Sequence, residues 1–183
     1  MKKFIAILLV SLILVACKEE LPSPPDSPNS YVLIQSSAYT EGDFMYYIEV
    51  LESDHFKEGE SITIQAYLAY TGDQDEIVIS HAASPFYYDI EELTHGYKID
   101  YPMEQPRIST TLKKGERLTS TYRISGGYGD QDNEDYIKFM KEFLSGRYPV
   151  GTYAVTGYAK FTVEGENEET KLPATIVFEV ESE

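Results

Sequence analysis

The sequence is short of thiols, of tryptophan and of positive charge. It has one Cys and no Trp in 183 residues, and 15 Lys and Arg stand against 31 Asp and Glu, which gives a net charge of −16. A single Cys excludes an internal disulfide and a thiolate metal cluster. The negative charge repels phosphate backbones, and no stripe of Lys and Arg offsets it. We therefore expect no nucleic-acid partner.

A long hydrophobic run is also missing. The longest apolar stretch, Phe4 to Ala16, follows the basic start Met1-Lys2-Lys3 and is shorter than the ~20 residues that a helix needs to cross a bilayer. It is typical of an export signal. Its end, Leu14-Val15-Ala16-Cys17, resembles the lipobox of bacterial lipoproteins, in which the Cys becomes the lipidated first residue of the mature protein.

The lipobox resemblance implies a signal peptide over residues 1–16 and acylation of Cys17, whose acyl chains would anchor the protein at ~0.8 kcal/mol per buried CH₂. An ordinary secretory signal that ends in an incidental Cys is the alternative. Residues 17–30 contain four prolines and no hydrophobic period, which predicts an extended tether. We expect a location on the outer face of the cell membrane, with a Gram-positive owner favoured by the family resemblance given below.

The remaining residues, 31–183, show the two-residue period of half-buried β-strands. In Ser61–Tyr70, Ile, Ile, Ala and Leu alternate with Thr, Gln and Tyr. We expect similar strands at Met45–Leu51, Ile77–Ile79, Phe86–Ile90, Tyr97–Tyr101, Leu118–Ile124, Tyr153–Val163 and Ala174–Val180. About eight short strands separated by turns predict one all-β domain, an immunoglobulin-like antiparallel β-sandwich.

One segment has helical spacing instead. The segment Asp132-Asn133-Glu134-Asp135, with three acidic residues, precedes an apolar face, and Gly146 follows as a stop. The apolar face consists of Tyr136, Ile137, Phe139, Met140, Phe143 and Leu144. The pattern predicts one short amphipathic helix at 133–145, inserted between two strands. We expect it to cap an end or a face of the sandwich. A partner-binding helix with an exposed apolar side is the alternative, although such a surface favours aggregation.

Five segments occur in an order that resembles the intracellular proteinase inhibitor domain of bacilli and its immunoglobulin-like relatives. They are Phe56–Ile64, Tyr70–Asp73, Phe86–Ile90, Leu112–Leu118 and Tyr148–Gly157. The resemblance spans residues 56–180 and implies the sandwich fold, with protease inhibition as an alternative function. The chain departs from that family in its export signal and in the helical insertion near 126–147, and no inhibitory segment can be matched.

Local patterns predict four turns. Pro149, Gly151 and Tyr153 suit a tyrosine corner, in which a buried ring returns its hydroxyl to the backbone. Lys57–Glu60 and Lys113–Glu116 share the pattern Lys-x-Gly-Glu, and we interpret them as equivalent turns of one domain. Residues 164–169 are expected to form the tip of a hairpin between the last two strands.

Candidate chemistry is sparse. His55, His81 and His95 show no local metal-binding spacing, so we expect His55 and His95 in loops and His81 at the end of a strand. The sole Cys is assigned to the lipid, and no G-x-S-x-G motif occurs. We therefore predict that the protein is not an enzyme and holds no cofactor.

Asp130, Asp132 and Glu134 occupy alternate positions, as at the start of a calcium loop. The copy is incomplete, because an EF-hand loop needs Gly at its sixth position and Glu at its twelfth, where this chain has Asp135 and Lys141. The alternative is an acidic turn that caps the helix.

Taken together, these features predict a lipid-anchored, extracytoplasmic, non-enzymatic binding module. It would contact the membrane through its lipid and display a surface for a protein partner, with loops at one end of the sandwich as the candidate surface. A proteinase inhibitor and a calcium-dependent binding module are the alternatives.

Overall fold

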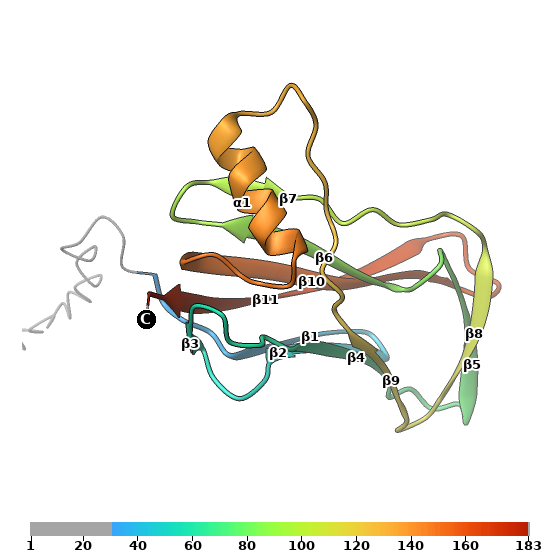
Figure 1. The fold of residues 1–183 in the computed structure, drawn as a ribbon. Coiled ribbons are helices and arrows are strands. Elements are labelled where there is room, and N and C mark those ends of the chain that lie inside the picture. Colours follow the sequence, from blue (N-terminus) through green and yellow to red (C-terminus); the bar gives the residue numbers. More distant parts are fainter. Residues whose placement is uncertain (1–30, 183) are drawn as a thin grey trace, which may run out of the picture. The chain divides into compact units, whose positions relative to one another are not determined.

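The computed structural model describes residues 31–182 (Figure 1). The predicted signal, tether and Cys17 lie outside these residues. The elements are β1 (Ser36–Glu41), β2 (Phe44–Val50), β3 (His55–Lys57), β4 (Ile64–Tyr70), β5 (Glu76–His81), β6 (Phe86–Glu92), β7 (Tyr97–Ile99), β8 (Ile108–Lys113), β9 (Arg117–Thr121), α1 (Glu134–Leu144), β10 (Gly151–Val163) and β11 (Glu169–Glu181).

The strands form two sheets. The smaller has the order β1-β2-β4-β9, and the larger contains β3, β11, β10, β5 and β8 in that order. Two strands share one edge of β10. β6 pairs with its first part, Tyr153–Ala159, and β5 pairs with its end, at Thr162 and Val163. Aromatic contacts such as Phe44 with Phe161 join the two sheets through one hydrophobic core. The predicted all-β sandwich with one helix is confirmed.

The pairing of β3 corrects one part of the prediction. β3 lies parallel to β11, with His55 opposite Glu179, so the expectation of an entirely antiparallel sandwich was wrong at this edge. Phe56 holds the short strand in place, since it is buried and packs edge-on against Phe178 at 5.8 Å. His55 and Lys57 therefore point away from the core, as the two-residue alternation requires.

The described chain begins at the end of the sandwich where β11 finishes. Ile34 pairs with Val177 of the larger sheet before the chain crosses to the smaller sheet as β1. The hydroxyl of Tyr31 donates to the carbonyl of Leu93 at 3.1 Å, and Leu93 pairs with Thr152, next to the start of β10.

The predicted hairpin between β10 and β11 lies at the other end (Figure 1). The ten residue steps from Thr152 to Thr162 on β10 correspond to about 33 Å. We call the end with Tyr31 the proximal end and the end with the β10–β11 hairpin the distal end.

The helix forms as the sequence predicts. The side-chain oxygen of Asn133 accepts hydrogen bonds from the N–H groups of Asp135 and Tyr136 and so caps the first turn of α1. Phe139, Met140 and Phe143 are buried, and Phe143 packs edge-on against Tyr148 at 5.1 Å. The apolar side thus closes the proximal end of the core, which contradicts the alternative of an exposed partner-binding face.

The predicted turns are also present. The hydroxyl of Tyr153 donates to the carbonyl of Pro149 at 2.6 Å, which makes the tyrosine corner. Both Lys-x-Gly-Glu segments close with a 3.0 Å hydrogen bond from the Glu N–H to the Lys carbonyl. Gly59 and Gly115 have φ of 88° and 77°, as a type II turn requires.

Candidate functional site

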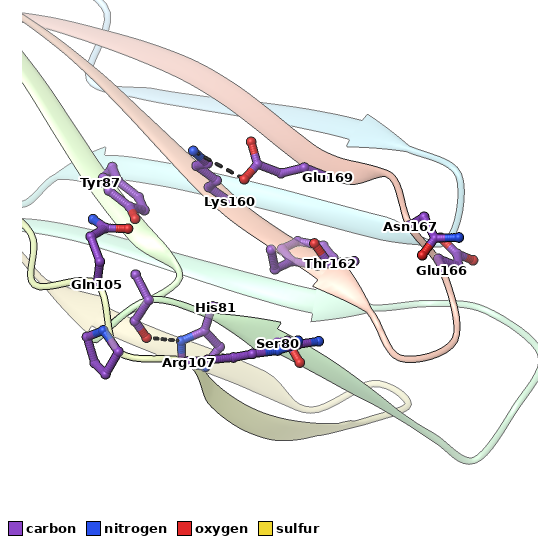
Figure 2. Close-up of a pocket in the computed structure, with 13 residues that line it drawn as sticks. Ser80, His81, Tyr87, Gln105, Arg107, Lys160, Thr162, Glu166, Asn167 and Glu169 are labelled. Atoms are coloured by element: carbon purple, nitrogen blue, oxygen red, sulfur yellow. Dashed lines mark hydrogen bonds and ion pairs between the residues drawn. The ribbon is translucent and has the colours of Figure 1, made fainter.

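A pocket of about 390 Å³ opens at the distal end of the larger sheet (Figure 2). We call it the distal pocket. Its lining comes from the end of β5, from β6, from the segment before β8, from β10 and from the β10–β11 hairpin with the start of β11. The lining residues are Ser80, His81, Ala82, Tyr87, Gln105, Pro106, Arg107, Lys160, Phe161, Thr162, Glu166, Asn167 and Glu169.

Strand alternation explains how β10 contributes to this pocket. Phe161 is 2% exposed and points into the core, where it packs against Phe44 at 4.8 Å. Lys160 and Thr162, its neighbours in the strand, therefore point outward. The outward face of β10 thus supplies the polar floor of the pocket between the loop that precedes β8 and the hairpin tip (Figure 2).

Two cations line the pocket of this acidic chain, and they differ in their partners. The ammonium of Lys160 lies 3.2 Å from a carboxylate oxygen of Glu169. Arg107 is exposed, and within residues 31–182 no carboxylate lies within 4.0 Å of its guanidinium. A guanidinium presents five donors in a planar fork that matches a carboxylate. Arg107 is therefore free to pair with an acidic group from outside.

His81 lines the pocket and also holds two strands together. Its Nδ1 lies 2.8 Å from the carbonyl oxygen of Ala82 and its Nε2 lies 2.8 Å from the hydroxyl of Thr110. A carbonyl only accepts, so Nδ1 carries the proton in the neutral ring. His81 is the last residue of β5, as predicted, and the imidazole ties that strand to β8.

A row of stacked side chains leads from β11 to the pocket. The ammonium of Lys171 lies 3.8 Å above the ring centre of Tyr158, and Tyr158 stacks on Tyr87 at 5.1 Å with 2° between the ring planes. Such a row fixes the positions of large side chains. Tyr88 lies on the opposite face of β6, where burial raises its pKa to about 12. The two adjacent tyrosines thus divide between surface and core, as the alternation of side chains along a strand requires.

The structure does not bring the predicted calcium ligands together. Asp132 accepts a hydrogen bond from the N–H of Gly129 at 2.7 Å, Glu134 begins the helix, and Asp130 is exposed. Among residues 31–182, the group whose ligand atoms converge is His55, Glu179 and Glu181. Calcium binding near residue 130 gains no support from the structure and stays a prediction.

His95 has a partner that the sequence did not reveal. Its Nδ1 lies 2.8 Å from Glu92, a carboxylate that is 0% exposed. Sequence analysis also missed Arg107 in the distal pocket. The scarcity of cations was the one signal that could have drawn attention to Arg107, since each Lys or Arg of a strongly acidic chain stands out.

Comparisons with known proteins do not assign the chain to a family. No protein-family model and no curated protein matches the chain. Among solved structures, the chain is similar to a protein from Archaeoglobus fulgidus with 13% sequence identity and a TM-score of 0.36, over 73% of this chain and 94% of the other. A likeness this distant carries no argument about function. Within residues 31–182, no helix combines the length and the hydrophobicity needed to cross a bilayer.

Proposed function

We propose that the protein is a lipid-anchored, extracytoplasmic, non-enzymatic binding module whose distal pocket contacts a protein partner. The observation that carries the proposal is the placement of this pocket. Its lining residues belong to the distal end, where the β10–β11 hairpin lies, whereas Tyr31, the first described residue, bonds to Leu93 at the proximal end. A chain held through acylated Cys17 would leave the distal end free for a partner.

The lining of the pocket supports a protein partner. It is polar, carries both signs of charge and includes a fixed Tyr ring, and Tyr and Arg are enriched at protein interfaces. Arg107 has no carboxylate partner within residues 31–182, so an acidic side chain or a chain carboxyl terminus would complete its pairing. Steric access is open because the pocket lies on the outward face of the sheet.

Replacement of Cys17 should release the protein from the membrane. We expect wild-type protein in the membrane fraction and the Cys17→Ser variant in the soluble extracytoplasmic fraction, because the variant cannot be acylated and no other anchor is proposed. Mass spectrometry of the mature N-terminus would show the acyl chains on the wild type only. Wild-type protein with an unmodified thiol at residue 17 would contradict the lipid anchor.

Crosslinking should locate the partner at the distal pocket. We expect a photoreactive residue at position 167 to give a discrete adduct in intact cells, and the same residue at position 52, outside the pocket, to give none. The Arg107→Glu variant should lose that adduct, because it replaces the guanidinium with a charge that repels an acidic partner. An adduct that persists in Arg107→Glu would remove the distal pocket from the proposal.

A protease assay distinguishes a binding module from a protease inhibitor. We expect the purified full chain to leave a panel of extracellular serine proteases uninhibited. Stoichiometric inhibition that Arg107→Glu does not relieve would replace the proposed function with the inhibitor alternative.

A further inference from the structure

The proximal end carries a group of ligand atoms that the proposed function does not use. We propose that His55, Glu179 and Glu181 bind one divalent transition-metal ion, with Zn²⁺ as the best match. One imidazole nitrogen and one oxygen from each carboxylate lie within 4.8 Å of one another. His55 Nδ1 is 3.7 Å from Glu179 and 3.9 Å from Glu181.

The backbone fixes all three side chains on one surface. His55 pairs directly with Glu179 across the parallel β3–β11 register, and Glu181 lies two residues further along the same face of β11. The N–H of Glu179 donates to the carbonyl of Asp54 at 2.8 Å, and the N–H of Glu58 donates to the carbonyl of Glu181 at 2.8 Å. The buried ring of Phe56 anchors β3 between these bonds. Metal binding would therefore require small side-chain movements only.

Lys57 is the competitor for this ion. Its ammonium pairs with the Oε2 atom of Glu181, while the Oε1 atom of that carboxylate faces His55. The positive charge of the ammonium offsets part of the negative potential that would attract a metal ion. Because one oxygen of Glu181 remains directed at His55, the ion and Lys57 would share this carboxylate.

The ligand set selects the class of metal. Imidazole suits Zn²⁺ and its neighbours, whereas Ca²⁺ takes six to eight oxygen ligands. Three protein ligands leave at least one position of a tetrahedral ion for water or for an external donor. The three side chains are between 40% and 57% exposed, and a groove of about 700 Å³ lined by Glu179 and Glu181 lies beside them. An external ligand could therefore reach the ion.

Calorimetry with ZnCl₂ tests this site. The protein is the full chain with Cys17→Ser, so that no thiol competes, and it carries no histidine tag. We expect one zinc ion per chain and no heat with CaCl₂ at the same concentration. His55→Ala and Glu179→Gln should each weaken zinc binding about tenfold or more. Lys57→Gln should tighten it about fivefold, because it removes a repelling charge and frees Glu181.

Glu76→Gln is the matched control, since it removes one exposed negative charge from β5, away from the site. It should leave the zinc affinity unchanged. Equal zinc affinity in wild type, His55→Ala and Glu179→Gln would overturn the proposal, as would an equal response to calcium. The distal pocket would be unaffected by that result, because it shares no residue with the metal site.

Discussion

The protein should unfold cooperatively in alkali, in a single step in which several buried tyrosines ionise together. Burial raises the pKa of five phenols in the hydrophobic core above the usual value, in the case of Tyr88 to about 12. All five side chains are at most 9% exposed. They are Tyr46, Tyr88, Tyr122, Tyr148 and Tyr153.

The direction of the effect follows from the pKa difference between the two states. An unfolded tyrosine ionises near pH ~10, so the raised pKa in the folded state contributes stability that is fully present below pH ~10. That stability is lost as the pH rises towards the folded pKa, because only the unfolded chain then releases protons. Between pH ~10 and its folded pKa, each such phenol lowers the free energy of unfolding by about 1.4 kcal/mol per pH unit. Five such phenols together lower it by about 7 kcal/mol per pH unit.

The surroundings of two of these phenols strengthen the expectation. The hydroxyls of Tyr46 and Tyr148 have no hydrogen-bond partner within residues 31–182. A phenolate at either position would be buried without a donor to stabilise it. The folded state therefore resists ionisation until it unfolds.

Phenolate absorbance and far-ultraviolet circular dichroism, followed together against pH, would measure this transition. We expect the buried tyrosines to titrate in the same narrow pH range in which the sheet signal disappears. Tyr88→Phe should reduce the slope of the free energy of unfolding against pH by about 1.4 kcal/mol per pH unit. Tyr87→Phe, on the outward face of β6, should leave that slope unchanged. Titration of all 16 tyrosines near pH ~10 without loss of structure would contradict the expectation.

The sequence predicts those strands that have one buried and one exposed face. In β4 the buried Ile64, Ala66 and Leu68 alternate with Gln65 and Tyr67, which are more exposed, and the two-residue period reports this directly. β1 and β8 were not predicted, because five of six residues in β1 and four of six in β8 are exposed. A strand without a buried face leaves no hydrophobic period to detect.

The candidate sites depend on long-range pairing, which the sequence does not show. His55 meets Glu179 because a three-residue strand pairs in parallel with a strand more than a hundred residues away. The distal pocket likewise combines residues from β5, the segment before β8 and the β10–β11 hairpin. Local spacing pointed instead to Asp130 and Asp132, which are neighbours in sequence but do not converge on a common point. Proximity along the chain is a poor guide to a site assembled across strands.

Glu92 is the residue whose replacement should destabilise the domain most specifically. Its carboxylate is 0% exposed and accepts three hydrogen bonds. The donors are the N–H of Thr94 at 2.7 Å, the N–H of His95 at 2.9 Å and Nδ1 of His95 at 2.8 Å. Gly151 makes room for this carboxylate, since a Cβ at that position would collide with Oε1. Glu92 thus organises the turn between β6 and β7 against the start of β10.

We expect Glu92→Leu to lower the free energy of unfolding by about 4 kcal/mol, because it keeps the side-chain volume but removes the acceptor of three hydrogen bonds, two of them from the backbone N–H groups of Thr94 and His95. Glu92→Gln should lower it by about 2 kcal/mol, since the amide retains one acceptor oxygen. Thermal or denaturant unfolding would measure both losses. Hydrogen exchange at the N–H groups of Thr94 and His95 should accelerate in the same order.

His95→Ala is the control that separates the backbone bonds from the imidazole. The side chain of His95 is 51% exposed, so its loss removes one donor and leaves both backbone bonds to Glu92 in place. We expect this variant to lose about 1 kcal/mol and to keep slow exchange at Thr94. If Glu92→Leu were as stable as His95→Ala, the Glu92 carboxylate would not stabilise the turn. The pairing of β6 with β7 would then hold the turn by itself.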